Sequence, residues 1–242
     1  MMLLIDAGNT RLKWTVRDAD DATCRSGACA FEGRALETEF TLLSEQLSVT
    51  RVIVTTVRSE ADRSTLDELV QKCLGVTPEF YWTEESRAGL KNAYEDPSIM
   101  GADRWHALVA AWKHLRESFI LIDAGSAITV EFVNDQGQHL GGYILPGRRL
   151  QLESLSLNTP RVLYDSDAAV QTMPGKNTTE CVHNGINWQR QLLIDRLMAM
   201  REFRHRVITG GDAEHWLTLG LKAHHWANLV FDGLAICASE AP

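Results

Sequence analysis

The stretch Leu4-Ile5-Asp6-Ala7-Gly8 occurs twice in this chain, and it returns unchanged about halfway along as Leu121-Ile122-Asp123-Ala124-Gly125. Each copy has an apolar run, an acidic residue, a small residue and a glycine, which indicates a buried strand ending at a carboxylate and a tight turn. A five-residue repeat arises by chance in roughly one to a few per cent of such chains. We therefore predict an internal duplication.

The two copies predict two related domains, over residues 1–117 and 118–242. A glycine turn after a strand lets backbone amides approach a phosphate closely, and a carboxylate is a ligand that Mg²⁺ prefers. We expect the domains to face each other across a cleft that holds a polyphosphate and its metal. The G-x-x-x-x-G-K-[ST] pattern does not occur, so a nucleotide site must be of another kind.

The composition is ordinary for a soluble globular protein, with 45% hydrophobic and 23% charged residues. A net charge of -8 without a run of Lys and Arg argues against nucleic acid as the main partner. No apolar run approaches the length of a membrane span, and Met1–Ile5 reaches Asp6 too soon for a signal peptide.

The cysteines and histidines predict no metal site and no disulfide. Five cysteines without a Cys-x-x-Cys pair favour reduced, mostly buried thiols of a cytoplasmic protein. The eight histidines are scattered without companion ligands at useful spacing, so we interpret them as packing or surface residues.

Hydrophobic periodicity predicts the same opening for both halves, which is three strands before the helices begin. In the first half the predicted strands are 3–6, 12–16, 27–31, 52–54 and 76–82, and the helices are 34–48, 59–75 and 103–116, with a polar connection over 83–102. In the second half the predicted strands are 119–123, 128–133, 140–145 and 206–209, and the helices are 148–157, 164–171, 178–203, one after 212 and one from about 231. The fold class is therefore α/β, as a pair of related domains.

The first candidate site is Asp6 with Gly8, Asn9, Thr10 and Lys13. The turn offers amides, Thr10 a hydroxyl and Lys13 a cation to phosphate oxygens, while Asp6 would hold Mg²⁺ or its water shell. Alone, the pattern is equally that of a hairpin turn with an Asx-type hydrogen bond. The second copy favours the phosphate site.

The second candidate is Gly101-Ala102-Asp103-Arg104, at the start of a predicted helix. Asp103 is either a residue favourable to the helix dipole or a general base that takes a proton from an attacking hydroxyl. Under the second interpretation, Arg104 and Tyr94 orient an acidic substrate beside it.

Two glycine-rich segments lie in the second half. Gly141–Gly147 is either a sheet corner or a place where a ligand lies against backbone. Gly210-Gly211-Asp212 either starts a helix or makes a flat bed for a nucleotide base.

Taken in order, these motifs resemble those of the type III pantothenate kinases, a branch of the superfamily of acetate and sugar kinases, Hsc-type chaperones and actin. The resemblance covers nearly the whole chain, and it implies two actin-like (ribonuclease H-like) domains across a nucleotide cleft. The implied reaction is ATP-dependent phosphorylation of the primary hydroxyl of pantothenate to 4'-phosphopantothenate, which begins coenzyme A biosynthesis. The resemblance further implies Mg²⁺, a monovalent cation (K⁺ or NH₄⁺), and a homodimer with the pantothenate pocket at the subunit interface.

Carried onto this sequence, the resemblance implies a role for each motif residue. Asp103 is the catalytic base. The residues implied to bind ATP are Asp6, Ala7, Gly8, Asn9, Thr10, Arg11, Leu12, Lys13, Ser126, Gly210 and Gly211. The residues implied to bind pantothenate are Tyr94, Gly101, Ala102, Asp103, Arg104, Gly142 and Thr178. Asp123 is implied to hold the monovalent cation, and Asp6 is expected to hold Mg²⁺.

The sequence departs from the family pattern in three places. Ser126 replaces a threonine but keeps a hydroxyl, Glu131 stands where aspartate is common, and Arg148-Arg149 is unusually basic. Three alternatives stay open: a kinase or phosphatase of the same superfamily acting on a sugar, acetate or polyphosphate; an actin-like ATPase acting as a filament former or regulator; and a protein that binds ligand without turnover.

Overall fold

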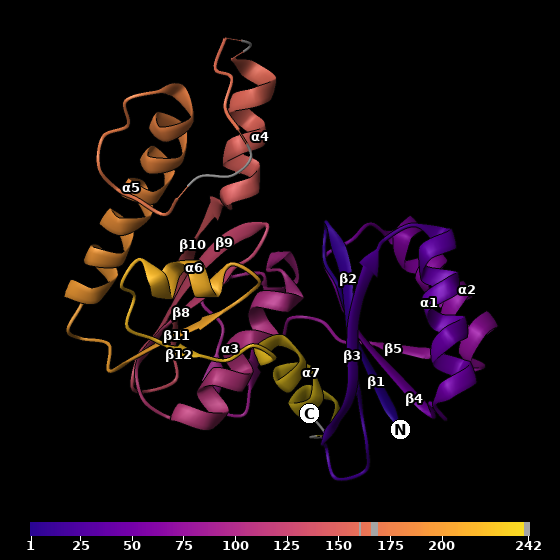
Figure 1. The fold of residues 1–242 in the computed structure, drawn as a ribbon. Helices are drawn as coiled ribbons and strands as arrows, with labels where there is room; N and C mark the ends of the chain where they lie inside the picture. Colours follow the sequence, from indigo (N-terminus) through magenta and orange to yellow (C-terminus); the bar gives the residue numbers. More distant parts are fainter. Residues whose placement is uncertain (160, 166–168, 240–242) are drawn as a thin grey trace. The chain divides into compact units, whose positions relative to one another are not determined.

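The fold is that of a computed structural model, in which residues 1–159, 161–165 and 169–239 are described (Figure 1). The chain divides into two compact units, one formed by Met1–His114 together with the segment from Asn228 onward, and the other by Leu115–Ala227. Among the described residues, no helix is long and apolar enough to cross a membrane.

The first unit is built on a five-stranded mixed sheet with the order β3-β2-β1-β4-β5. Its strands are β1 (Met2–Ala7), β2 (Arg11–Arg17), β3 (Thr23–Ala30), β4 (Arg51–Thr56) and β5 (Pro78–Phe80). β1 pairs with β2 antiparallel and with β4 parallel. Alternate residues of these strands, among them Leu3, Ile5 and Val54, pack with the apolar stripes of α1 (Gly33–Gln46) and α2 (Glu60–Leu74).

The opposite face of this sheet is covered from the far end of the chain. Helix α7 (Leu229–Ser239) packs its Phe231 and Leu234 against Leu4 of β1 and Ile53 of β4. Helix α3 (Ala102–Leu115) contacts α7 so closely that a Cβ built on Gly233 would lie 1.7 Å from the His106 carbonyl oxygen. The C-terminal helix is therefore part of the first unit's core.

The second unit repeats the first sheet strand for strand. Its order is β10-β9-β8-β11-β12, with β8 again antiparallel to one neighbour and parallel to the other. The strands are β8 (Phe119–Ala124), β9 (Ala127–Val133), β10 (His139–Pro146), β11 (His205–Thr209) and β12 (His224–His225), and the helices are α4 (Arg148–Asn158), α5 (Thr178–Ala199) and α6 (Ala213–Thr218). The predicted duplication and α/β class are confirmed.

The units differ from the predicted halves at the C-terminal end. The predicted division between residues 117 and 118 lies close to the observed one after His114, but the segment from Asn228 joins the first unit. The helical pattern of residues 231–237 shows an apolar face without showing which sheet that face covers.

Three predicted elements need correction. The strand expected over 76–82 is only Pro78–Phe80, and the connection over 83–102 contains a small hairpin of β6 (Ser86–Arg87) and β7 (Leu90–Lys91) and the 3-10 helix η1 (Pro97–Ile99). The helix expected over 164–171 is absent from its described residues, while 166–168 lie outside them.

The third correction concerns the end of α5, which was expected near Phe203 and falls at Ala199. The Arg206 guanidinium donates hydrogen bonds to the carbonyl oxygens of Leu197, Met200 and Phe203. A cation just beyond the helix therefore satisfies carbonyls that the helix end leaves without partners.

The cysteines, all within the described residues, form no disulfide. The expectation that most of them are buried is wrong, because Cys24 and Cys181 are exposed and only Cys237 is fully buried.

The tight contact between α3 and α7 makes a testable prediction about two helical glycines. Gly233→Ala should destabilise the protein by about 1–3 kcal/mol or more, because the new methyl group meets backbone that cannot move away. Gly185→Ala, in α5, is the matched control: nothing lies within 4 Å of its Cβ position, so it should stabilise by about 0.5–1 kcal/mol. Urea unfolding of both variants measures these free energies, and an unchanged Gly233→Ala would contradict the packing of α7.

Candidate active site

The end of β1 places Asp6 between two polar residues on one face of the first sheet. Asp6 lies opposite Lys13 of β2 and opposite Thr55 of β4 in the strand register. The residues on either side of it, Ile5 and Ala7, point into the core on the other face. The hairpin therefore sets a carboxylate, an ammonium group and a hydroxyl in one row across three strands.

The turn after Asp6 is held by a residue that the sequence analysis missed. Arg58 Nη1 donates to the carbonyl oxygens of both Gly8 and Asn9, at 3.0 Å each. Its Nε contacts Asp62 in the first turn of α2 at 3.2 Å. Asn9 and Thr10 stay exposed on the turn. In the sequence, Arg58 stands in Val57-Arg58-Ser59 before α2, and nothing in that stretch indicates that its side chain contacts the turn after Asp6.

Three of the residues implied to bind ATP are placed less directly. The side chains of Ala7 and Leu12 are fully buried in the core, so only their backbone can face a ligand. The Arg11 guanidinium contacts the Ala28 carbonyl oxygen of β3 at 3.5 Å.

Asp103 lies in the first turn of α3, where its Oδ1 accepts the Arg104 backbone N–H at 2.8 Å. Burial raises the pKa of this carboxyl, while the Arg104 N–H and the charges of Arg104 and Lys13 act in the opposite direction. Gly101 makes room for the carboxylate, since a Cβ there would lie 2.7 Å from Asp103 Oδ1. Asp103 is therefore close enough to Lys13 for the lysine charge to act on its carboxyl, and Lys13 lies opposite Asp6 in the strand register.

Arg104 is buried at 9% exposure, and its Nη1 donates to the Tyr94 hydroxyl at 3.0 Å. The guanidinium also lies 5.7 Å from the centre of the Tyr94 ring. Tyr94 and Arg104, which were both expected to orient the substrate, therefore contact each other, and a guanidinium held in this way can bind a carboxylate. Their role toward the substrate stays a prediction.

His106 lies one helical turn beyond Asp103 and is fully buried. Its Nδ1 is 3.0 Å from the hydroxyl of Thr55, the residue opposite Asp6. Burial lowers the pKa of His106 from 6.5 to about 3, so the ring is neutral at pH 7. His106 is the packing residue that the sequence predicts, and it also joins α3 to the strand beside Asp6.

The second turn is built in the same way in the second unit. Asp123 lies opposite Thr129 of β9 and opposite Thr209 of β11. Gly210 adopts a φ of 94°, and a Cβ there would meet Asp123 Oδ1 and the Ala124 carbonyl at 2.5 Å. The Gly147 N–H donates to the Ser126 carbonyl at 3.0 Å. Glycines from two other segments thus surround this turn.

The Gly141–Gly147 segment is an irregular strand. The pairing of β10 with β9 shifts register between His139 and Gly142, and Gly141 has a φ of 98°. A Cβ on Gly142 would lie 2.4 Å from the Val130 carbonyl oxygen and closer still to Glu131, which is fully buried and 3.1 Å from His139 Nε2. The sheet-corner interpretation therefore accounts for these glycines, and a role for Gly142 toward substrate stays a prediction.

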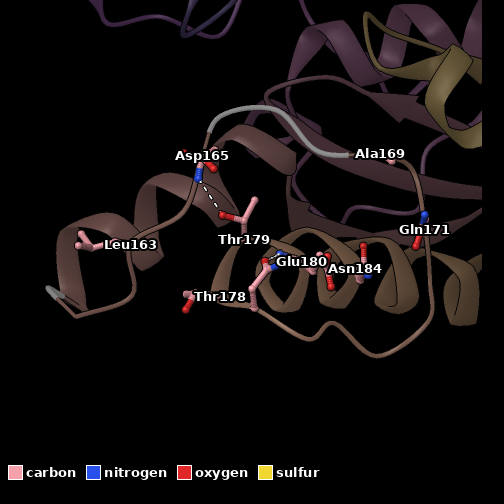
Figure 2. Close-up of a pocket in the computed structure, with 9 residues that line it drawn as sticks. Leu163, Asp165, Ala169, Gln171, Thr178, Thr179, Glu180 and Asn184 are labelled. Carbon is pink, nitrogen blue, oxygen red and sulfur yellow. Dashed lines mark hydrogen bonds between the residues drawn. The ribbon is translucent and has the colours of Figure 1, made fainter.

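Thr178 is the first residue of α5 and lies at a pocket of about 620 Å³ in the second unit (Figure 2). The Asn177 side chain caps the helix by accepting the Glu180 N–H at 2.9 Å. Asp165 and Gln171 approach from the preceding segment, and the Asp165 N–H donates to the Thr179 hydroxyl at 3.1 Å. Most residues that line the pocket are polar, and the role of Thr178 toward the substrate stays a prediction.

No three His, Cys, Asp or Glu side chains of the described residues gather as a metal site. Proteins commonly hold Mg²⁺ by one or two carboxylates together with substrate phosphates, so a Mg²⁺ site does not require such a group. Asp6 fits such a role. Asp123, with the hydroxyls of Thr129 and Thr209 beside it in the register, offers the hard oxygen donors that an alkali cation accepts.

Solved structures with the same fold define the class. A protein described as a conserved Baf family transcriptional activator from Campylobacter jejuni matches 98% of this chain and 97% of its own, with a TM-score of 0.63 and 21% identity. A 2-dehydro-3-deoxygalactonokinase from Sinorhizobium meliloti matches 98% of both chains with a TM-score of 0.55 and 12% identity. The chain is an α/β protein with the actin-like fold.

It belongs to the type III pantothenate kinase family, whose model matches residues 2–200, and it is thus a phosphotransferase. A type III pantothenate kinase of Marinobacter nauticus is 41% identical over 99% of this chain and 98% of its own length. One from Pseudomonas putida strain W619 is 34% identical over 98% of both.

The buried His106 makes stability depend on pH. The unfolded ring takes up a proton below its ordinary pKa of 6.5 and the folded ring only near 3, so the stability contributed by the neutral ring is complete above 6.5 and falls as the pH falls toward 3. We expect this residue alone to cost about 1.4 kcal/mol per pH unit between pH 6 and 4. Urea unfolding should show that His106→Gln removes this slope and that His114→Gln, exposed on the same helix, keeps it. Equal slopes in all three proteins would contradict the neutral ring.

Proposed function

We propose that this enzyme transfers the γ-phosphoryl group of ATP to the primary hydroxyl of pantothenate, giving 4'-phosphopantothenate, the first step of coenzyme A biosynthesis. The proposal is supported by membership of the family and by one feature of the first unit: a half-buried carboxylate, Asp103, grouped with Lys13 and beside the fixed cation Arg104. Phosphoryl transfer needs positioning and charge neutralisation more than covalent help.

Asp103 is the general base in this proposal. Burial raises its pKa, which makes the carboxylate a better proton acceptor, while the Arg104 backbone N–H and the charges of Arg104 and Lys13 act in the opposite direction. Arg104, held by the Tyr94 hydroxyl, binds the pantothenate carboxylate. Thr178 and the polar pocket beside it contact the polar part of the same substrate.

The amides of the first turn and Lys13 bind phosphate oxygens, and Arg58 keeps that turn in place through the Gly8 and Asn9 carbonyls. Ser126 and the Gly210-Gly211 turn supply contacts to the nucleotide from the second unit. Mg²⁺ held through Asp6 would neutralise phosphate charge, and a monovalent cation (K⁺ or NH₄⁺) would bind at Asp123.

We also propose a homodimer in the cytoplasm. β10 is an edge strand of its sheet, and it exposes Tyr143 and Ile144, each at 62%, followed by Leu157 of α4 at 81%. An edge strand and a helix that both expose large apolar side chains are typical of a protein interface. The absence of disulfides among the five cysteines suits a reducing compartment.

Asp103→Asn tests the base. It should lower turnover by about 10²–10⁴-fold, because an amide cannot accept the hydroxyl proton, while ATP binding stays near wild type. A coupled ADP-release assay with pantothenate, Mg²⁺ and K⁺ measures the turnover. In the wild type kcat/KM should fall with decreasing pH, through a pKa above the ordinary aspartate value.

Asp67→Asn, an aspartate of α2 that contacts Gln71, is the matched control and should keep full activity. Near-normal turnover of Asp103→Asn would reject the assignment of the base. Turnover with a sugar acid or acetate but none with pantothenate would reject the substrate.

Ile144→Glu tests the dimer. A carboxylate on the apolar edge strand should convert the dimer to a monomer, because burying that charge against a second copy is unfavourable. Leu42→Glu, at a 43% exposed residue of α1, should leave the dimer intact. Light scattering after size-exclusion chromatography measures the mass, and a wild-type monomer would contradict the proposal.

A further inference from the structure

The buried face of α5 changes character along its length. Toward the C-terminus it presents Ile194 and Leu197 to the core, as an amphipathic helix should. Toward the N-terminus the buried residues His183, Asn187 and Arg190, at 2–3% exposure, are polar and fall on the same stripe at helical spacing. Burying polar side chains at core positions costs free energy unless hydrogen bonds compensate, so a buried polar stripe indicates a role beyond packing.

Arg190 is the most unusual of them. Its Nη2 lies 2.7 Å from Asp212 Oδ2, and its guanidinium lies 5.9 Å from the centre of the buried Trp216 ring. Its Nε and Nη1, although buried, have no hydrogen-bond partner among the residues that the structure describes. A buried guanidinium with unused N–H donors is unfavourable and calls for a ligand that accepts from them.

A second guanidinium lies near the first. Arg148, the first residue of α4, donates from Nη2 to His183 Nδ1 at 2.8 Å, and His183 Nε2 is 2.8 Å from the Asp165 carbonyl oxygen. His183 Nδ1 therefore accepts the hydrogen bond from Arg148, and Nε2 donates to the Asp165 carbonyl oxygen, so the imidazole is neutral. Its role is to orient the Arg148 guanidinium. Arg148 is close enough to Arg190 for its charge to lower the pKa of the Arg190 guanidinium, although burial is the larger cause.

The remaining members of the cluster do not balance the charge. His215 Nε2 lies 2.9 Å from Asn187 Oδ1, and the Asn187 amide donates to the Gln171 carbonyl at 3.1 Å. Burial, with Arg190 the next cause, lowers the pKa of His215, so this ring is also neutral near pH 7. Asp212 pairs with Arg190, whereas Arg148 contacts the neutral imidazole of His183.

The cluster is attached to the second Asp-Ala-Gly turn at both ends. The Asp212 N–H donates to the Ala124 carbonyl at 2.9 Å, and Gly147, which directly precedes Arg148, donates to the Ser126 carbonyl at 3.0 Å. The partner of Arg190 and the residue that precedes Arg148 are thus hydrogen-bonded to the turn that the proposed function assigns to the nucleotide.

We propose that Arg148 and Arg190 bind a phosphate group of the nucleotide, with His183 and Asp212 positioning the two guanidiniums. A phosphate offers three oxygens, enough for two planar donors at once, whereas a carboxylate offers two. This inference rests on the proposed nucleotide role of the second turn. The arginine pair adds charged donors to a turn that otherwise offers only amides and the Ser126 hydroxyl.

The test compares Arg190→Met and Arg148→Met with Arg149→Met. Arg149 is the neighbouring residue of α4, exposed and paired with Glu153, so it is a matched control for the loss of a nearby cation. Thermal unfolding is measured with no addition, with inorganic phosphate, with ADP and with adenosine, and KM for ATP is measured in the pantothenate assay.

In the wild type and Arg149→Met, phosphate and ADP should raise the unfolding temperature. In Arg190→Met and Arg148→Met the ADP-induced rise should shrink and KM for ATP should increase about ten- to hundredfold, while the response to adenosine stays the same. Arg190→Met removes a buried cation with unused donors but also leaves the Asp212 carboxylate without that partner, so each variant's ligand response is compared with its own unfolding temperature without addition. Arg148 is only half-buried, so its variant keeps the test valid should Arg190→Met fold poorly.

An equal ADP response in all four proteins would overturn the inference, and so would an unchanged KM for ATP in both cluster variants. The inference would also be overturned if the variants lost the rise in unfolding temperature caused by phosphate but kept the rise caused by ADP. The arginines would then bind inorganic phosphate and not the nucleotide. A wild type that binds ADP through the arginines but does not turn over pantothenate would instead overturn the proposed function.

Discussion

Each unit depends on one backbone arrangement, in which a central strand is hydrogen-bonded to an antiparallel neighbour on one side and a parallel neighbour on the other. Because side chains alternate between faces, this register places Asp6 in a row with Lys13 and Thr55, and Asp123 in a row with Thr129 and Thr209. A shift of the strand register by one residue would point each carboxylate into the apolar core on the other face of its sheet. The apolar residues on the opposite face therefore hold the acids in position.

Much of the fold could be predicted, because duplication and strand–helix alternation are local patterns. The repeated motif predicted two equal sheets, and Ser59 and Gly75 marked α2 by ordinary capping chemistry. What failed was decided by contacts that periodicity does not reveal. Arg206 lies just beyond α5 and donates from its side chain to carbonyl oxygens at the end of that helix. Helix α7 completes a sheet whose first strand is at the other end of the chain.

The candidate site divides in the same way. Asp6 and Lys13 belong to one hairpin, so their proximity follows from the sequence. The influence of Lys13 on Asp103 joins residues that are far apart in the chain, and no periodicity reveals it. Arg58 and the Arg148–Arg190 pair were missed for that reason, although the polar stripe at 183, 187 and 190 is a signal that the sequence does contain.

The return of α7 to the first sheet has a consequence for biosynthesis. As the nascent chain leaves the ribosome, every strand of the second unit emerges before α7 does, so that unit can complete its core while the first sheet still shows Leu4 and Ile53 to water. The first sheet is thus covered after the second unit has been translated, and a chain cut short before α7 would expose Leu4 and Ile53. Burial of this apolar face therefore depends on the translation of α7.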